Sequence, residues 1–218
     1  MIAIDGPGGS GKSTVARRLA AELRLSYLDT GATYRAVTLA ALRAAVPLDD
    51  AAALTALATD LTAVNRLILD TRVGTGAVLL DGEDVSALIR GPEVTAAVSA
   101  VSAVAGVRRV LVTWQRALAR HSDGCVLEGR DTGSVVVPEA RVKVWLTAAP
   151  EIRAARRGAE DGVDAGADLH RRDAADASRT VDPMQPAADA IVLDSSTLGI
   201  EETVGAVLAR VRQAYRLP

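Results

Sequence analysis

Five short hydrophobic runs recur along the chain, and each has the length and composition of a buried strand. Strands that are covered on both faces lack the alternation of hydrophobic and polar residues seen in half-exposed strands, and they favour Val, Leu and Ile. The pattern therefore predicts strands at Ile2–Ile4, Ser26–Leu28, Cys125–Leu127, Val142–Leu146 and Ala190–Leu193.

Hydrophobic residues recur every three or four positions between these runs, which predicts helices. One pattern covers Ser13–Leu25, and a longer one runs from Val94 to Leu118 with Gly106 as a point where it can break. The last covers residues 200–215, with Gly199 as its N-cap. Strands that alternate with helices predict a doubly wound α/β fold around a five-stranded parallel sheet.

The stretch from Leu61 to Arg90 interrupts the alternation. Leu67-Ile68-Leu69 and Val78-Leu79-Leu80 have the pattern of strands, and Asp81-Gly82 is a typical tight-turn pair. We therefore predict a small antiparallel β insert at residues 61–92.

The remaining residues, 1–60 and 93–218, are predicted to form one core. Within that core, residues 158–168 are mainly Gly, Ala and Asp, with few hydrophobic groups to bury. Their composition predicts a short mobile lid.

Composition excludes several functional classes. The net charge of −2 does not favour nucleic acid or an anionic membrane, and 2% aromatic residues give no platform for stacking bases. Hydrophobic stretches stay well below 18 residues and the first is too short for a signal peptide, so we expect a cytoplasmic protein. We interpret Cys125 as a buried hydrophobic residue and His121 and His170 as surface residues, since none has partners at metal-ligand spacing.

A phosphate-binding loop is the most specific local motif. Gly6-Pro7-Gly8-Gly9-Ser10-Gly11-Lys12-Ser13 fits G-x-x-x-x-G-K-[ST] and lies between a predicted strand and a predicted helix, as the motif requires. Glycines let successive N–H groups converge on a phosphate, and the helix N-terminus adds partial positive charge. Lys12 can reach the β- and γ-phosphates, and the Ser13 hydroxyl can bind Mg²⁺. The predicted ATP site is Gly6, Pro7, Gly8, Gly9, Ser10, Gly11, Lys12, Ser13 and Thr14.

Other features narrow the class of nucleotide-binding protein. Lys12 and Lys143 are the only lysines in an Arg-rich sequence, so a lysine at the key position of the motif is conspicuous. The guanine-reading N-K-x-D element of GTPases is absent, because the only asparagine lies in Asn65-Arg66-Leu67-Ile68. Motor and transport ATPases are usually larger and carry a Walker B strand of hydrophobic residues that ends in Asp. A small-molecule kinase remains.

A kinase needs a second anion site, and three clusters can supply it. They are Asp29-Thr30-Gly31-Ala32-Thr33-Tyr34-Arg35, Gly129-Arg130-Asp131, and Arg171-Arg172-Asp173 with Asp176 and Arg179. The first two follow predicted parallel strands, at whose carboxyl ends open α/β sheets bind ligands. Arginine donates to phosphate through two parallel hydrogen bonds. By contrast, we interpret Arg153 and Arg210 as solvated surface charges.

Taken together, these motifs resemble the bacterial cytidylate kinases, which phosphorylate CMP and dCMP. The resemblance covers nearly the whole chain. Beyond the P-loop, the motifs that carry it are Leu28-Asp29-Thr30-Gly31-Ala32-Thr33-Tyr34-Arg35, Leu80-Asp81-Gly82-Glu83-Asp84-Val85, Val107-Arg108, Gly129-Arg130-Asp131-Thr132-Gly133, Arg172-Asp173 with Asp176 and Arg179, Pro186-Ala187-Ala188-Asp189-Ala190, and Leu193-Asp194-Ser195-Ser196.

The resemblance implies roles for particular residues. Lys12, Arg130, Arg172 and Arg179 would be catalytic, with Mg²⁺ bound through Ser13 and ATP as co-substrate. The β insert would lie on the monophosphate side. The base would be read by Ser99, Arg108 and Asp131, because a carboxylate can accept from the exocyclic amine of cytosine and an arginine can donate to its ring acceptors. The full CMP-binding set would be Thr30, Tyr34, Arg35, Ser99, Arg108, Arg130, Asp131, Arg172, Asp176 and Arg179.

The chain departs from the family pattern in two places, and other functions stay open. The segment after Arg157 is shorter than the usual lid, and Ala174, Ala175 and Ala177 stand where relatives often have charged residues. The alternatives are a P-loop kinase for UMP, AMP or shikimate, and an ATP-dependent switch or binding protein. We expect a monomer that acts on small nucleotides, without nucleic-acid or membrane partners.

Overall fold

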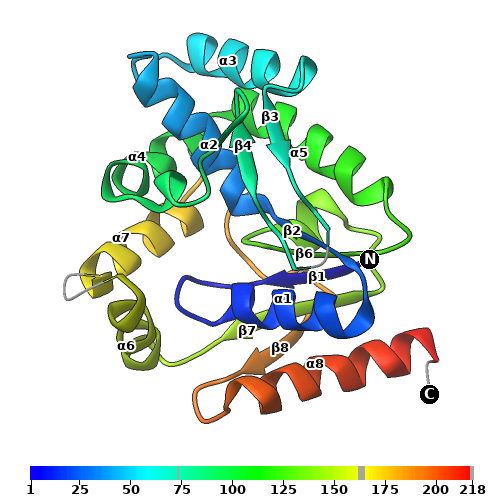
Figure 1. Cartoon of the computed structure of the whole chain (residues 1–218). Coiled ribbons are helices and arrows are strands. Elements are labelled where there is room, and N and C mark those ends of the chain that lie inside the picture. The colour runs from blue at the N-terminus through cyan, green and yellow to red at the C-terminus, as the bar shows by residue number, and fades with distance from the viewer. Residues whose placement is uncertain (73, 162–164, 217–218) are drawn as a thin grey trace.

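A five-stranded parallel sheet forms the centre of the molecule (Figure 1). The computed structural model describes residues 1–72, 74–161 and 165–216. The strands are β1 (Ile2–Asp5), β2 (Ser26–Asp29), β6 (Cys125–Gly129), β7 (Val142–Thr147) and β8 (Ile191–Asp194), in the order β2-β6-β1-β7-β8. All four neighbouring pairs are parallel, as the five hydrophobic runs predicted.

Helices cover both faces of this sheet. On one face, α1 (Lys12–Leu23) and α8 (Ile200–Tyr215) bury hydrophobic side chains against β1 and β7, forming a core that includes Val15 and Val207. On the other face, α2 (Thr30–Arg43) and α5 (Ala105–Arg120) lie against β6. The doubly wound fold and the bounds of the last helix are confirmed.

The long helical pattern after residue 92 forms two helices. Helix α4 (Pro92–Ala103) is followed by Val104, where the axis turns by 96° into α5. The break thus falls two residues before Gly106. Gly106 instead packs against α3 (Ala51–Ala63), where an added Cβ would lie 2.1 Å from Thr55 Oγ1. Across the described residues, no single helix is long and hydrophobic enough to span a bilayer, and only the bent α4–α5 pair passes the length and composition test.

The predicted β insert is present as a separate three-stranded sheet. It consists of β3 (Leu67–Leu69), β4 (Val78–Leu80) and β5 (Glu83–Asp84), paired antiparallel in that order. Asp81 and Gly82 make the turn between β4 and β5. A 3₁₀ turn, η1 (Leu88–Arg90), follows the sheet and leads into α4. Leu67 and Leu80 point into a core shared with α2, α3 and α5.

The described residues of the segment predicted as a mobile lid are helical, so they do not form the loop that their composition indicated, while their movement as a lid stays a prediction. Residues 158–161 end α6 (Pro150–Asp161) and residues 165–168 begin α7 (Ala165–Ala177), while residues 162–164 lie outside the described part of the chain. Alanine is the strongest helix former, so a segment with few hydrophobic groups can still be helical when helices pack beside it. Here α6 and α7 pack on each other and α7 also contacts α4.

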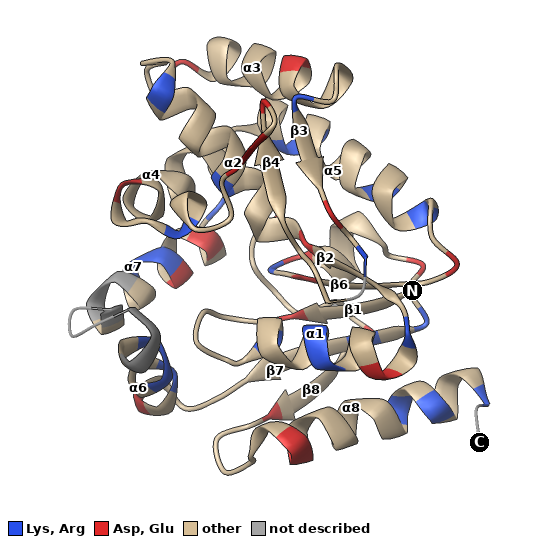
Figure 2. Ribbon diagram, viewed as in Figure 1, with Lys and Arg blue, Asp and Glu red and all other residues tan. Residues whose placement is uncertain are grey.

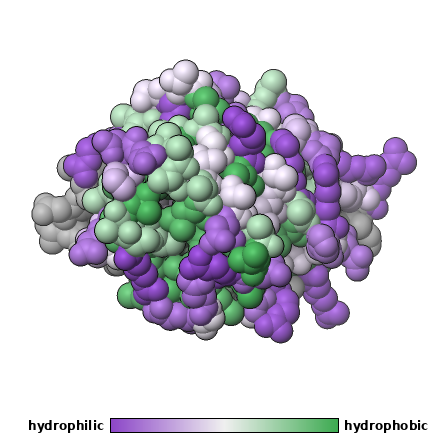
Figure 3. All heavy atoms as spheres, turned by 90° about the horizontal axis from the view of Figure 1, so that it is seen from above, coloured by the Kyte–Doolittle hydropathy of each residue, from purple (hydrophilic) through white to green (hydrophobic). Residues whose placement is uncertain are grey.

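Exposed hydrophobic side chains are few on the described surface. Figure 3 looks onto the end that carries α3, where hydrophobic side chains gather in one area with hydrophilic ones around them. Val64, Ile68 and Leu88 are among the large exposed residues, as are Ile191 and Val192 on the edge strand β8. Exposure of this extent is ordinary for a folded domain.

Candidate active site

The P-loop leaves the sheet at the end of β1, beside the turn that follows β6. Asp5 accepts hydrogen bonds from Thr132 N and Oγ1, both at 2.8 Å, and from Gly133 N at 2.7 Å. Thr132 and Gly133 belong to a single π-helical turn, Thr132–Val136. Burial raises the pKa of Asp5, while these hydrogen bonds act in the opposite direction. The contacts fix the two loops relative to each other.

Two charged residues from α6 and α7 hold the P-loop from outside. Arg153 donates to Gly8 O at 2.9 Å and to Asp173 Oδ2 at 2.5 Å, and Asp173 Oδ1 accepts from Gly8 N at 3.0 Å. Gly9 has a φ of 69°, and a Cβ there would lie 2.5 Å from Arg153 O, so only glycine fits.

The interpretation of Arg153 as a surface charge was therefore wrong, because the residue is buried. Packing of α6 and α7 around the P-loop buries it, and sequence position could not show that. Arg210 is exposed, as expected, as are His121 and His170, while Cys125 is buried.

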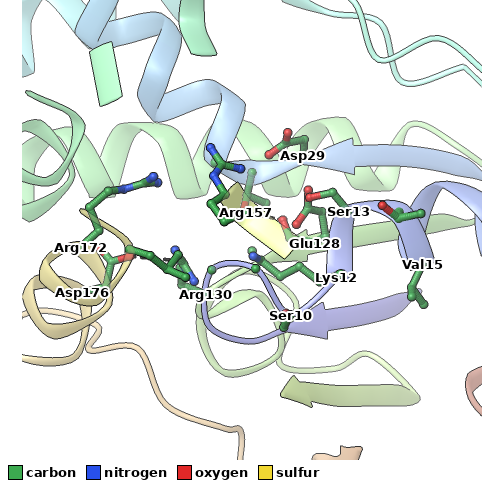
Figure 4. A pocket seen from close by; sticks show the side chains of 18 of the residues that line it. Ser10, Lys12, Ser13, Val15, Asp29, Glu128, Arg130, Arg157, Arg172 and Asp176 are labelled. Atoms are coloured by element: carbon green, nitrogen blue, oxygen red, sulfur yellow. Dashed lines mark hydrogen bonds and ion pairs between the residues drawn. The ribbon is translucent and has the colours of Figure 1, made fainter. Parts of the chain in front are cut away.

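Lys12 begins α1 and extends toward the ends of β2 and β6 (Figure 4). Its Nζ donates to Pro7 O at 3.4 Å, and burial together with nearby Arg130 lowers its pKa to about 8. Glu128, near the end of β6, accepts from the Tyr27 hydroxyl at 3.0 Å and also from Ser13. Burial and the neighbouring Asp29 raise the pKa of Glu128. A lysine, a hydroxyl and a carboxylate thus meet at the helix N-terminus.

Around the next part of the site lie four arginines: Arg35, Arg130, Arg172 and Arg179. Arg130 donates to Gly6 O at 2.8 Å and pairs with Asp176 at 3.1 Å, and Arg179 pairs with the other oxygen of Asp176 at 2.9 Å. Arg35, on α2, donates to Ile89 O at 2.9 Å and to Thr95 Oγ1 at 3.0 Å.

In two of these arginines, burial and a neighbouring arginine disfavour the charged form. Burial and nearby Arg172 lower the pKa of Arg35 to about 9, and burial and nearby Arg130 lower the pKa of Arg172. Mutual repulsion of buried cations is relieved when an anion binds among them. This part of the site is therefore suited to a phosphate group.

The end of the site beyond the arginines is buried and lined by polar groups. The Arg108 guanidinium, fully buried, pairs with Asp131 and with Asp182 Oδ2 at 2.9 Å, and lies 5.5 Å from the Tyr34 ring centroid. Its Nη1 has no hydrogen-bond partner among the described residues. Burial raises the pKa of Asp131 to about 6, although Arg108 acts to lower it. This end offers both an acceptor and a donor to a planar polar ring.

One cleft of about 740 Å³ joins these parts. In Figure 4, Ser13, Lys12 and Glu128 lie on one side, and Arg130, Arg172 and Asp176 lie on the other. Figure 2 shows basic positions along α6 and α7. Of the sequence-predicted site residues, Gly6 and Pro7 do not line the cleft. Those that do are Gly8, Gly9, Ser10, Gly11, Lys12, Ser13, Thr14, Thr30, Tyr34, Arg35, Ser99, Arg108, Arg130, Asp131, Arg172, Asp176 and Arg179.

Known proteins match the chain along its length. A protein-family model for cytidylate kinase matches residues 2–213. The cytidylate kinase of Rhodococcus jostii is 48% identical over 221 residues, covering 98% of this chain and 95% of the relative. That of Nocardia farcinica is 48% identical over 212 residues, covering 94% and 90%. This chain belongs to the cytidylate kinase family.

A solved structure also matches in fold. An uncharacterized protein from Eubacterium ventriosum aligns over 97% of both chains, with a TM-score of 0.50 and 14% identity. At that identity, the likeness concerns the fold alone.

Sequence reasoning missed several residues of this cytidylate kinase family member that the structure brings to the site. Glu128 is the last residue but one of the buried strand β6, so an acidic residue lies near the end of this strand, as Glu where a Walker B strand has Asp. Asp182, which the sequence did not single out, pairs with Arg108, and Asp173, which was placed in the third cluster, pairs with Arg153. Glu128 could have been found from the sequence, because it directly follows the hydrophobic run Cys125–Leu127. Nothing in the sequence indicates that Asp182 pairs with Arg108.

Proposed function

We propose that this member of the cytidylate kinase family transfers the γ-phosphoryl group of ATP to CMP, and that dCMP is also an acceptor. The arrangement of the cleft is the observation that carries the proposal. It places a P-loop lysine, a group of arginines and a donor–acceptor pair for a base in succession along one continuous cavity.

The P-loop is the part that would bind ATP. Backbone N–H groups at the start of α1 and the ammonium of Lys12 favour the triphosphate. An anionic ligand also restores the charged form of Lys12, whose pKa is lowered by burial. Leu198 and Ile200 are hydrophobic residues that line the cleft and could cover the adenine.

The residues next to Lys12 fit Mg²⁺. The Ser13 hydroxyl and the Glu128 carboxylate are oxygen donors, the kind that Mg²⁺ prefers, and Mg²⁺ usually takes only one or two protein groups along with phosphate and water. When bound, Mg²⁺ supplies positive charge that stabilises the transferring phosphoryl group.

The arginine group would hold the acceptor phosphate in line with the γ-phosphate. An oxygen of the acceptor phosphate attacks the γ-phosphorus, a new P–O bond forms, and the bond to the β–γ bridging oxygen breaks to release ADP. The acceptor phosphate is already anionic, so no general base is needed. Arg130, Arg172 and Arg179 stabilise the charge that spreads over the transferred group.

The buried polar end would select the base. Asp131 can accept from the exocyclic amine of cytosine, and Arg108 can donate through Nη1 to a ring acceptor. Uracil has a carbonyl in place of the amine, so the contact with ionised Asp131 becomes unfavourable by about 1–3 kcal/mol.

Asp176 bears on whether dCMP is accepted. Both carboxylate oxygens of Asp176 already have partners within the protein, because one pairs with Arg130 and the other with Arg179. Because these two ion pairs hold the carboxylate, its position depends little on a hydrogen bond from the 2′-hydroxyl of the sugar. We therefore expect kcat/KM for dCMP to lie within about tenfold of that for CMP.

The test is release of ADP from ATP and Mg²⁺ in parallel reactions with CMP, dCMP, UMP, AMP and GMP. We expect fast release with CMP and dCMP, slower release with UMP and none with the purine nucleotides. Lys12→Ala should abolish release, whereas Arg210→Ala, a change at an exposed arginine, should not alter it. ATP binding without release on any acceptor would refute the proposal and favour a switch or binding protein. Sedimentation at the assay concentration tests the expected monomer.

A further inference from the structure

The Arg108 guanidinium is held by two carboxylates, of which only Asp131 lines the described part of the cleft. We propose that Asp182, the other carboxylate, is a positioning residue that fixes Arg108 for reading the acceptor base and so helps to set the preference for cytosine over uracil. The inference rests on the proposed function, since it concerns the same acceptor site.

Geometry supports an action through Arg108. Asp182 Oδ2 accepts from Arg108 Nε at 2.9 Å, while Asp131 pairs with Nη2. A guanidinium is planar, so partners at Nε and Nη2 fix its plane and the direction of the remaining nitrogen. That nitrogen, Nη1, is the one without a hydrogen-bond partner in the described structure.

Two carboxylates beside Arg108 allow one to neutralise its charge while the other contacts the base. If Asp131 alone held Arg108, the same group would have to neutralise a buried cation and accept from the base. With Asp182 on Nε, Arg108 keeps a counter-charge when Asp131 engages the substrate. Burial of Arg108 makes this necessary, because a buried charge that loses its partner is strongly destabilised.

The position of Asp182 connects this contact to the acceptor-phosphate side. Asp182 follows α7, the helix that carries Arg172 and Asp176, and adopts a left-handed φ of 49°. Met184 N donates to Asp176 O at 2.9 Å, which folds the segment back onto the end of α7. The residue that orients Arg108 is therefore joined to the residues that face the phosphate.

The experiment compares Asp182→Asn and Asp182→Ala with the wild type, using CMP and UMP as acceptors at saturating ATP. For Asp182→Ala we expect KM for CMP to rise about tenfold and KM for UMP to rise less, so that the preference for CMP narrows. Asp182→Asn should fall in between, because its amide oxygen can still accept from Nε. KM for ATP should stay within about twofold, which a general loss of structure would not allow.

A matched control is Asp81→Asn. Asp81 also has a left-handed φ, 52°, and also pairs with an arginine, Arg66 at 2.6 Å, but in the small sheet. It should behave like the wild type with both acceptors.

Two failures can be told apart. If the wild type phosphorylates CMP and Asp182→Ala keeps its KM for CMP and its CMP-to-UMP preference, the role of Asp182 is refuted while the proposed function stands. If the wild type shows no turnover, calorimetric titration with CMP decides. Weaker CMP binding by Asp182→Ala would then support the role of Asp182, and equal binding or none by either protein would overturn it.

Discussion

Replacing Arg153 by methionine tests how far the P-loop depends on a residue outside its motif. The change keeps much of the aliphatic stem and removes the guanidinium that donates to Gly8 O and Asp173. Both partners are buried, so water cannot simply replace the lost donor. Gly8 O is left without this hydrogen bond, and Asp173 loses its shortest contact to an arginine.

The size of the destabilisation follows from the bonds that are lost and from the contacts that Asp173 keeps. A hydrogen bond that involves a charged group contributes about 1.5–3 kcal/mol, and two such bonds disappear. The loss of stability is smaller than this sum, because Asp173 keeps its contacts with Arg130 at 3.2 Å and with Gly8 N at 3.0 Å. In addition, the substitution removes Arg153 Nε, a buried donor that has no partner within the described residues. We expect the free energy of unfolding to fall by about 3 kcal/mol, which for a protein of this size lowers Tm by roughly 6–12 °C.

The assay is thermal unfolding together with steady-state kinetics. A displaced Gly8 should raise KM for ATP by about tenfold and leave KM for CMP nearly unchanged, since the damage lies on the triphosphate side. Arg210→Met is the matched control, because Arg210 is exposed and its loss should change stability by less than about 0.5 kcal/mol. A Tm within about 2 °C of the wild type with an unchanged KM for ATP would refute the reasoning.

Three further expectations concern charge in the cleft. Because the pKa of Lys12 is lowered to about 8, the affinity for ATP should fall as pH rises through that value. Binding titrations from pH 7 to 9 test this, and an affinity that does not change with pH would contradict the role of Lys12 in binding the triphosphate. Asp131, with a pKa raised to about 6, should be ionised at pH 7.5 and largely neutral at pH 5.5, where its O–H can donate to the uracil carbonyl. The ratio of kcat/KM for UMP to that for CMP should thus rise about tenfold on acidification in the wild type, but not in Asp131→Asn. Arg179→Ala should lower kcat more than Arg157→Ala, because Arg179 is paired with Asp176 beside the acceptor site; equal rates for the two variants would speak against this.

Local sequence patterns were enough for the central sheet and the phosphate-binding loop. Strands buried on both faces leave continuous hydrophobic runs, and the P-loop works through backbone geometry that glycines encode directly. The antiparallel insert was also readable, because Asp81-Gly82 and its flanking hydrophobic runs are local signals. The helices of the lid segment were missed, because its few hydrophobic groups indicated a mobile loop, whereas alanine content and packing of α6 against α7 produce helices.

By itself, the sequence determined what is written in neighbouring residues: the strand–loop–helix that binds phosphate, and the arginines and carboxylates available to a second site. Tertiary structure alone decided which of these charges meet. Arg153 and Arg210 look alike in the sequence, yet only Arg153 is buried against the P-loop. Asp182 and Arg108 are 74 positions apart, and only packing of the chain after α7 beside α5 pairs them. The physical reason is that an ion pair depends on distance and burial, which the fold fixes and the local sequence does not.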